Sequence, residues 1–111
     1  MAEIRVLTTW RPPTAEEIQA WQPFADEADV AGWRLNVEWM DPWEDPETGE
    51  VSPGRLHWFI SHEELCSDGR IHAYMLDVPE TPPEWPGAWK AELELARVGW
   101  VDYLARAGVA A

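Results

Sequence analysis

The hydrophobic and polar positions of residues 33–40, WRLNVEWM, alternate along the chain and predict a strand. One face of this strand carries the hydrophobic side chains, namely Trp33, Leu35, Val37 and Trp39. Residues 3–9, EIRVLTT, hold β-branched side chains in rough alternation and predict an earlier strand, which the prolines that follow it bring to an end. The first part of the chain therefore supplies two strands.

Two further segments predict a β-hairpin in the second half of the chain. Residues 56–65 and 70–78 are rich in hydrophobic side chains, and typical turn residues lie between them: Ser67, Asp68 and Gly69. Their alternation is imperfect, which indicates that both faces of this hairpin are partly covered. Residues 41–54, DPWEDPETGEVSPG, contain three Pro and two Gly and predict a long loop.

Two segments have the spacing of amphipathic helices. The first covers residues 15–31, and Thr14 can cap it while Glu17 completes a capping box. Pro23 lies inside this segment and predicts a kink or a restart. The second covers residues 86–107, where hydrophobic side chains recur at three- and four-residue steps: Trp89, Leu93, Ala96, Trp100 and Leu104.

These elements occur in the order β-α-β-β-β-α and predict a single α+β domain over residues 1–111. We expect a two-layer architecture, in which helices pack on a mostly antiparallel sheet. Because the first helix connects the first two strands, those strands are expected to be parallel neighbours through a right-handed crossover. The sequence shows no internal repeat and no change of composition that would mark a second domain.

The tryptophan content argues for a folded protein. Nine Trp residues and 46% hydrophobic residues are unlike the composition of a disordered acidic chain. Four Trp side chains fall on regular hydrophobic stripes and are expected in the core: Trp33, Trp39, Trp89 and Trp100. Exposed rings could instead stack on sugars or methylated cations, and the candidates for such platforms are Trp39, Trp43, Trp58, Trp85 and Trp89.

The charge excludes several classes of protein. Acidic residues outnumber basic residues by 21 to 8, which gives a formal net charge of -13. Direct binding of nucleic acid and binding to an acidic membrane surface both need clustered basic side chains, so neither is expected. No apolar run approaches the roughly 18 residues of a membrane span, and no secretory leader is recognisable. We therefore expect a cytoplasmic protein.

The negative charge is concentrated in residues 12–54, which hold eleven acids and one base and contribute -10 to the total. One explanation is solubility, because an acidic surface keeps a protein dispersed. A second explanation is a surface that imitates the phosphates of a nucleic acid and binds a basic partner, with Trp43 as an aromatic anchor. The residues expected to form this surface are Glu16, Glu17, Asp26, Glu27, Asp29, Glu38, Asp41, Trp43, Glu44, Asp45, Glu47 and Glu50.

The second explanation leads to a functional hypothesis. In small size, acidity and lack of an active-site motif, the chain resembles phage-encoded nucleic-acid mimics and immunity proteins that neutralise nucleases, although it shares no particular motif with them. The resemblance implies a non-enzymatic, anti-CRISPR-like or other anti-defence inhibitor, or an immunity protein, whose partner is a nuclease or another basic nucleic-acid-binding protein. The alternative is a structural or assembly protein of a phage or bacterium, and a homodimer is compatible with the sequence.

Catalytic and metal-binding patterns are weak. One cluster contains metal-ligand residue types, and its spacing matches no zinc motif: His57, His62, Cys66 and His72. His57 and His62 are five residues apart, so a regular strand directs them to opposite faces. Cys66 is a candidate nucleophile by residue type alone. We therefore expect no enzymatic activity, no bound metal and no cofactor.

Overall fold

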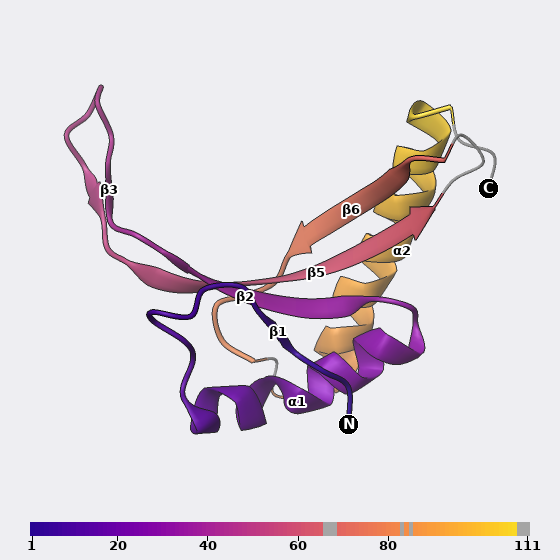
Figure 1. Cartoon of the computed structure of the whole chain (residues 1–111), viewed down its shortest axis with the longest axis horizontal. Helices are drawn as coiled ribbons and strands as arrows, with labels where there is room; N and C mark the ends of the chain where they lie inside the picture. The colour runs from indigo at the N-terminus through magenta and orange to yellow at the C-terminus, as the bar shows by residue number, and fades with distance from the viewer. Residues whose placement is uncertain (66–68, 83, 85, 109–111) are drawn as a thin grey trace.

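Two helices cover one face of a four-stranded sheet in the computed structural model of the chain (Figure 1). The structure describes residues 1–65, 69–82, 84 and 86–108. It confirms the predicted α+β class, and the described residues form six strands rather than four. The elements in chain order are β1 (Arg5–Val6), α1 (Ala15–Val30), β2 (Arg34–Met40), β3 (Trp43–Glu44), β4 (Val51–Ser52), β5 (Arg55–Leu65), β6 (Ile71–Asp77) and α2 (Pro86–Arg106).

The main sheet has the strand order β1-β2-β5-β6. β1 pairs with β2 in parallel, as the connection through α1 predicts, and the other neighbours are antiparallel. β1 is shorter than the predicted strand, because only Arg5 and Val6 pair with β2. The register places the hydrophobic side of β2 beside that of β5, so that Val37 lies opposite Trp58 on the face that the helices cover.

The first helix is capped as the sequence predicts. The Thr14 hydroxyl accepts a hydrogen bond from the Glu17 N–H (3.2 Å), and the Glu17 carboxylate accepts one from the Thr14 N–H (3.0 Å). The restart considered at Pro23 does not occur, since α1 is one continuous helix. Trp21 and Phe24 flank Pro23 and are almost fully buried, and this burial offsets the hydrogen bond that proline removes.

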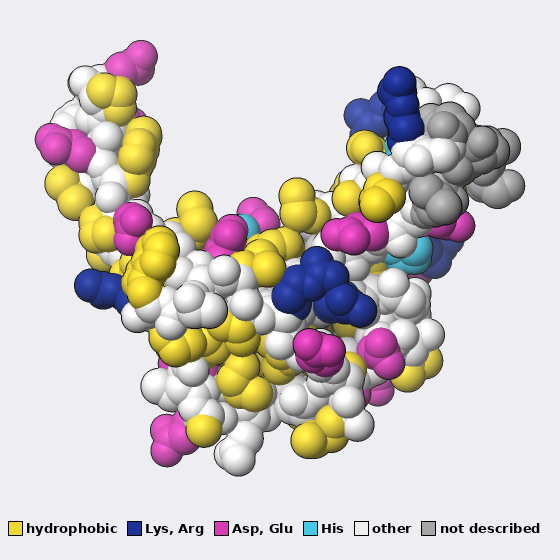
Figure 2. Space-filling model, in the orientation of Figure 1, with side chains coloured by type: hydrophobic (Ala, Val, Ile, Leu, Met, Phe, Trp, Pro, Cys, Tyr) yellow, Lys and Arg dark blue, Asp and Glu magenta, His cyan; other side chains and the backbone are white. Residues whose placement is uncertain are grey.

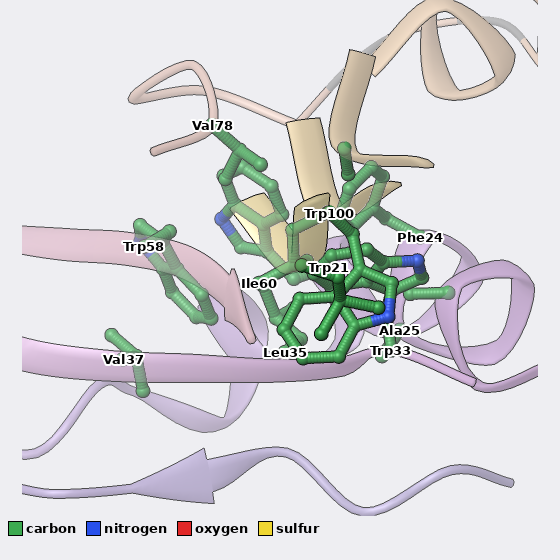
Figure 3. Close-up of a cluster of buried hydrophobic side chains, with 13 residues drawn as sticks. Trp21, Phe24, Ala25, Trp33, Leu35, Val37, Trp58, Ile60, Val78 and Trp100 are labelled. Carbon is green, nitrogen blue, oxygen red and sulfur yellow. The ribbon is translucent and has the colours of Figure 1, made fainter. Parts of the chain in front are cut away.

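Aromatic side chains fill the layer between the helices and the sheet (Figure 3). Trp21 of α1 stacks on Trp58 of β5 with 4.7 Å between the ring centroids. Trp100 of α2 stacks on His62 of β5 at 4.6 Å, and Trp33 meets both of these rings edge to face. The predicted burial of Trp33 and Trp100 is confirmed. Two other predicted core rings are only half-buried: Trp39 and Trp89.

The opposite side of the sheet has no helix on it in the described part of the chain, and we call it the open sheet face. Alternate residues of the strands point to it: Arg5, Arg34, Asn36, Glu38, Met40, Arg55, His57, Phe59, Ser61, Glu63, Ile71, Ala73, Met75 and Asp77. Met75 is 63% exposed and Ile71 is 71% exposed. The open sheet face is therefore a mixed surface of charged and apolar side chains.

Residues 41–54 form a β-hairpin, which we call the acidic hairpin, and not the long loop that their Pro and Gly content predicts. β3 and β4 pair in antiparallel and make a second, two-stranded sheet. The acidic hairpin projects from the rest of the fold (Figure 1). The radius of gyration is accordingly 15.7 Å, compared with about 13 Å for a compact chain of this length. With only two residue pairs, its strands are too short to produce a recognisable alternation.

The second helix approaches β6 closely at Gly99. A Cβ atom on Gly99 would overlap the phenol oxygen and ring of Tyr74, so only glycine allows this contact. Tyr74 in turn lies beside Tyr103 of α2, with 6.1 Å between the ring centroids. In the described residues, neither helix combines the length and the apolar character that crossing a bilayer requires.

We predict that Gly99→Ala lowers the free energy of unfolding by up to about 2 kcal/mol, because the added methyl group pushes α2 away from Tyr74 at a cost of about 1–3 kcal/mol. Helix propensity acts in the opposite direction and favours Ala over Gly by roughly 1 kcal/mol. Urea unfolding followed by far-UV circular dichroism measures the difference. A variant more stable than the parent protein would show that the contact between Gly99 and Tyr74 does not limit the packing of α2.

Candidate protein-binding surface

The turn of the acidic hairpin is held by main-chain hydrogen bonds. The Asp45 N–H donates to the Glu50 carbonyl (2.8 Å), and the Gly49 N–H donates to the Asp45 carbonyl (2.9 Å). Gly49 has a φ of +74°, a left-handed conformation that glycine adopts without strain. The register continues below the turn, where Glu44 lies opposite Val51. These bonds give the tip of the hairpin a defined shape.

The side chain of Asp45 also organises the turn. Its carboxylate accepts hydrogen bonds from the N–H groups of Glu47 (2.8 Å) and Thr48 (3.4 Å). A carboxylate that closes a turn on its own main chain is a common use of Asp at such positions. Asp45 therefore has a structural role in addition to its charge.

Trp39 packs where the acidic hairpin leaves the sheet. Its indole ring lies so close to Gly54 that a Cβ atom there would overlap it, and its Nε1–H donates to the Asp41 carboxylate (2.8 Å). The guanidinium of Arg11 lies over the ring at 4.8 Å from the centroid. The half-buried Trp39 thus connects both strands of the hairpin base to the segment that follows β1.

The exposed side chains of the acidic hairpin are acidic or apolar. Trp43 is 58% exposed and Val51 is 67% exposed. Glu44, Glu47 and Glu50 are also exposed, and their carboxylates have no hydrogen-bond or ion-pair partner among the described residues. Residues 41–54 contain no Lys or Arg. Trp43 shares one face of the hairpin with Ser52, and Glu44 shares the other face with Val51. Exposed apolar side chains together with free carboxylates are features of protein-binding surfaces.

Three side chains link strands across the open sheet face. The His57 ring lies between two carboxylates, with Nδ1 3.2 Å from Glu38 Oε1 and Nε2 2.8 Å from Asp77 Oδ1. These residues come from β5, β2 and β6 respectively. Because the two ring nitrogens point in opposite directions, the two carboxylates cannot converge with His57 on one metal ion. Glu38 and Asp77 therefore add negative charge to the open sheet face beside the hairpin.

The predicted acids of α1 belong to a helix that packs on the face of the sheet opposite the open sheet face. Glu17 completes the helix cap. Asp26 accepts from the Ala2 N–H (2.7 Å) and from the Gln22 side chain (2.9 Å), and these hydrogen bonds, the one from Ala2 first, hold the pKa of Asp26 below its usual value of 3.8. The remaining acids of α1 are exposed: Glu16, Glu27 and Asp29.

The structure therefore divides the twelve predicted binding residues into two groups. Glu38 and six predicted residues between Asp41 and Glu50 lie on the acidic hairpin or at its base, whereas of the five acids of α1 only Glu17 lines the cavity at that base. This cavity of about 430 Å³ is lined by Glu17 and Glu80 together with Arg11 and Arg55. Arg55 is ion-paired with Glu80 (3.0 Å), so Arg11 is the guanidinium that interrupts the negative surface there. Figure 2 shows acidic side chains along the hairpin and basic side chains at its foot.

The candidate metal ligands do not come together. His57 lies on the open sheet face, whereas His62 and His72 point to the helix-covered face, which confirms the predicted opposition of His57 and His62. Within the described ranges, no three His, Cys, Asp or Glu side chains are placed to hold a metal ion. Cys66 and the candidate platform Trp85 lie outside the described residues. Of the other platform candidates, Trp58 is buried.

Sequence patterns did not identify several apolar residues of this surface. The Pro and Gly content of residues 41–54 predicts a loop that includes Val51, and the imperfect alternation of residues 70–78 does not show that Ile71 and Met75 are exposed. The signal for Ile71 and Met75 is the alternation of exposed and half-buried residues along β6. The sequence contains that alternation, but only the placement of both helices on one side reveals which alternate residues are exposed.

We predict that Asp45→Ala loosens the turn of the acidic hairpin, because two main-chain N–H groups lose their acceptor. Limited proteolysis read by mass spectrometry should show faster cleavage within residues 45–50. Glu47→Ala is the matched control, since it removes the same charge from an exposed side chain without such contacts. Equal cleavage of the two variants would contradict the structural role of Asp45.

Comparisons with known proteins find no significant match to this chain among protein-family models, curated proteins or solved structures. Function is therefore inferred from the side chains and geometry of the chain itself.

Proposed function

We propose that this chain is a non-enzymatic inhibitor that binds the basic nucleic-acid-binding surface of a nuclease or another nucleic-acid-handling protein. The observation that supports this proposal is the acidic hairpin, a projecting element with unpartnered carboxylates, an exposed Trp43 and no basic residue. A basic groove built for phosphates is the surface most complementary to such an element.

Electrostatics favours a basic partner over a neutral one. Like charges held on one hairpin without a cation repel one another and reduce stability. Basic side chains of a partner remove this repulsion and replace the water around Glu44, Glu47 and Glu50 with charge-assisted hydrogen bonds. The attraction acts over about one Debye length, roughly 10 Å at 0.1 M salt, so binding should weaken as salt is raised.

Apolar contacts add binding free energy to the electrostatic attraction. Trp43 is exposed on one face of the hairpin, and Val51 is exposed on the other face, where it lies opposite Glu44. An exposed Trp buries a large area on binding, and interface energy concentrates on such residues inside a ring of polar groups. Trp43 is therefore the expected anchor, with the carboxylates setting the approach and the choice of partner.

Occupation of the groove would block nucleic acid directly. An acidic hairpin bound to the basic residues competes with phosphates for the same side chains, so inhibitor and nucleic acid exclude each other. A phage-type anti-defence protein and an immunity protein against a nuclease toxin would both use this mode of action. The identity of the nuclease that is bound distinguishes them.

We predict that reversing the three free carboxylates of the hairpin, with Glu44→Lys, Glu47→Lys and Glu50→Lys together, weakens binding to a basic nuclease by at least about tenfold at low salt. The experiment measures binding to a panel of purified nucleases with basic clefts by biolayer interferometry, with and without competing DNA. Far-UV circular dichroism checks that the fold is retained.

The matched control reverses three exposed carboxylates of α1, with Glu16→Lys, Glu27→Lys and Asp29→Lys together. It changes the net charge by the same amount on the other side of the molecule, and we expect much weaker effects. Equal loss of binding in both triple variants would mean that total charge acts without a defined surface. Absence of salt-sensitive binding to every nuclease in the panel would count against the proposed function itself.

A further inference from the structure

The strand β6 forms one edge of the main sheet, and none of the described residues pairs with its outer side. Natural proteins protect such edges with Lys, Pro or inward-pointing charges, because open edges pair with other strands. β6 has the sequence IHAYMLD and contains neither Lys nor Pro. A seven-residue edge of this composition is suited to pairing with another strand.

The direction of the free main-chain groups follows from one hydrogen bond. The Val78 N–H donates to the Trp58 carbonyl of β5 (3.2 Å). In an antiparallel pair the main-chain groups of alternate residues point to the same neighbour. The even-numbered residues of β6 therefore face β5, and the N–H and C=O groups of Ile71, Ala73 and Met75 face outward.

These outward residues are self-complementary under a twofold axis at Ala73. An antiparallel pair of two β6 strands centred there sets Ala73 opposite Ala73 and sets Ile71 of each copy opposite Met75 of the other. The side chains of all three residues lie on the open sheet face, where Ile71 and Met75 are exposed. The same pairing therefore satisfies the main chain and buries two large apolar side chains per copy.

The helix beside this edge has an apolar side that the fold leaves uncovered. Leu95 is 59% exposed, Val98 51% and Val101 55%, although α2 buries its opposite side against the sheet. Leu95 lies one helical turn before Gly99, which contacts Tyr74 of β6, so Leu95 is on the side of α2 next to the strand edge. A twofold axis normal to the sheet places both copies of α2 on the same face, with these sides toward each other.

The charge of this region is compatible with a second copy of the same chain. Residues 86–106 carry three bases and three acids, although the whole chain has a net charge of -13. Two of the acids are in ion pairs within the helix, Glu94 with Arg97 (2.6 Å) and Asp102 with Arg106 (2.5 Å). β6 adds only Asp77. Two copies can thus approach here without the repulsion that the acidic regions would cause.

We propose that the chain forms a homodimer in which two β6 edges pair around Ala73 and the Leu95 sides of two α2 helices meet beside them. A second copy fits better than a basic partner, because this region is largely apolar and carries far less negative charge than the hairpin. It fits better than an unrelated strand, because the register pairs apolar residues with apolar residues under twofold symmetry. The dimer does not depend on the proposed function.

Sedimentation equilibrium of the purified chain over a wide concentration range tests this proposal. We expect a reversible equilibrium between the 12.7 kDa monomer and a species of twice that mass. Ala73→Lys places two like charges opposite each other at the axis and should weaken the dimer by at least about tenfold. Leu95→Lys, on the other element, should weaken it as well without disturbing the strand.

Ala20→Lys is the matched control, because Ala20 is exposed on α1 and the variant changes the charge by the same amount. It should dimerise like the parent protein. If the chain sediments as a monomer at every concentration, the proposed dimer is overturned. A dimer that withstands both Ala73→Lys and Leu95→Lys, or one that Ala20→Lys weakens equally, would overturn the assignment of this surface.

Discussion

The stacking of aromatic side chains on one face of the sheet determines the rest of this structure. Trp21 on Trp58 and Trp100 on His62 tie α1 and α2 to β5. Each buried Trp removes roughly 150–250 Å² from water, which corresponds to on the order of 4–6 kcal/mol of transfer free energy. Because both helices are held on this side, the open sheet face, the acidic hairpin and the β6 edge remain available for other molecules.

The acidic hairpin can act as a binding element because its base is fixed. Trp39 contacts Gly54 and donates to Asp41, and Arg11 covers its ring, so the hairpin and the body share one packed junction. A fixed base lowers the conformational entropy that binding would otherwise cost. The carboxylates above this junction are therefore presented in a constant arrangement, which a flexible acidic loop would not achieve. If the chain dimerises through β6, each dimer carries two such hairpins.

Sequence reasoning predicted the regular parts of the fold. The alternation of Trp33, Leu35 and Val37 and the capping box at Thr14 are strong local signals, and both are present as expected. The acidic hairpin gives no clear sequence signal, because β3 and β4 share only two residue pairs and Pro and Gly lie before and between the two strands. In these places the fold is decided by contacts between distant residues, such as Trp39 with Gly54.

The candidate site was predicted only in part for a related reason. Counting charge along the sequence puts the acids of α1 together with those of residues 41–54. In the fold, α1 packs on the helix-covered face while the hairpin projects away from it (Figure 1), and of the α1 acids only Glu17 lines the cavity at the hairpin base. Two of these acids also have structural roles within the chain. The Asp45 carboxylate closes a turn, and the Asp26 carboxylate accepts a hydrogen bond from the N-terminal segment. Neither the side that an acid faces nor the partner it already has can be derived from spacing alone.

The electrostatic potential near each amide tests the central claim most directly. NMR relaxation enhancement by cationic and anionic nitroxide probes of matched size reports this potential residue by residue. The account predicts the most negative values at residues 43–51, with less negative values along α1 and near-neutral values along α2. Values along α1 that are as negative as those of the hairpin would contradict the claim that the hairpin carries the binding surface.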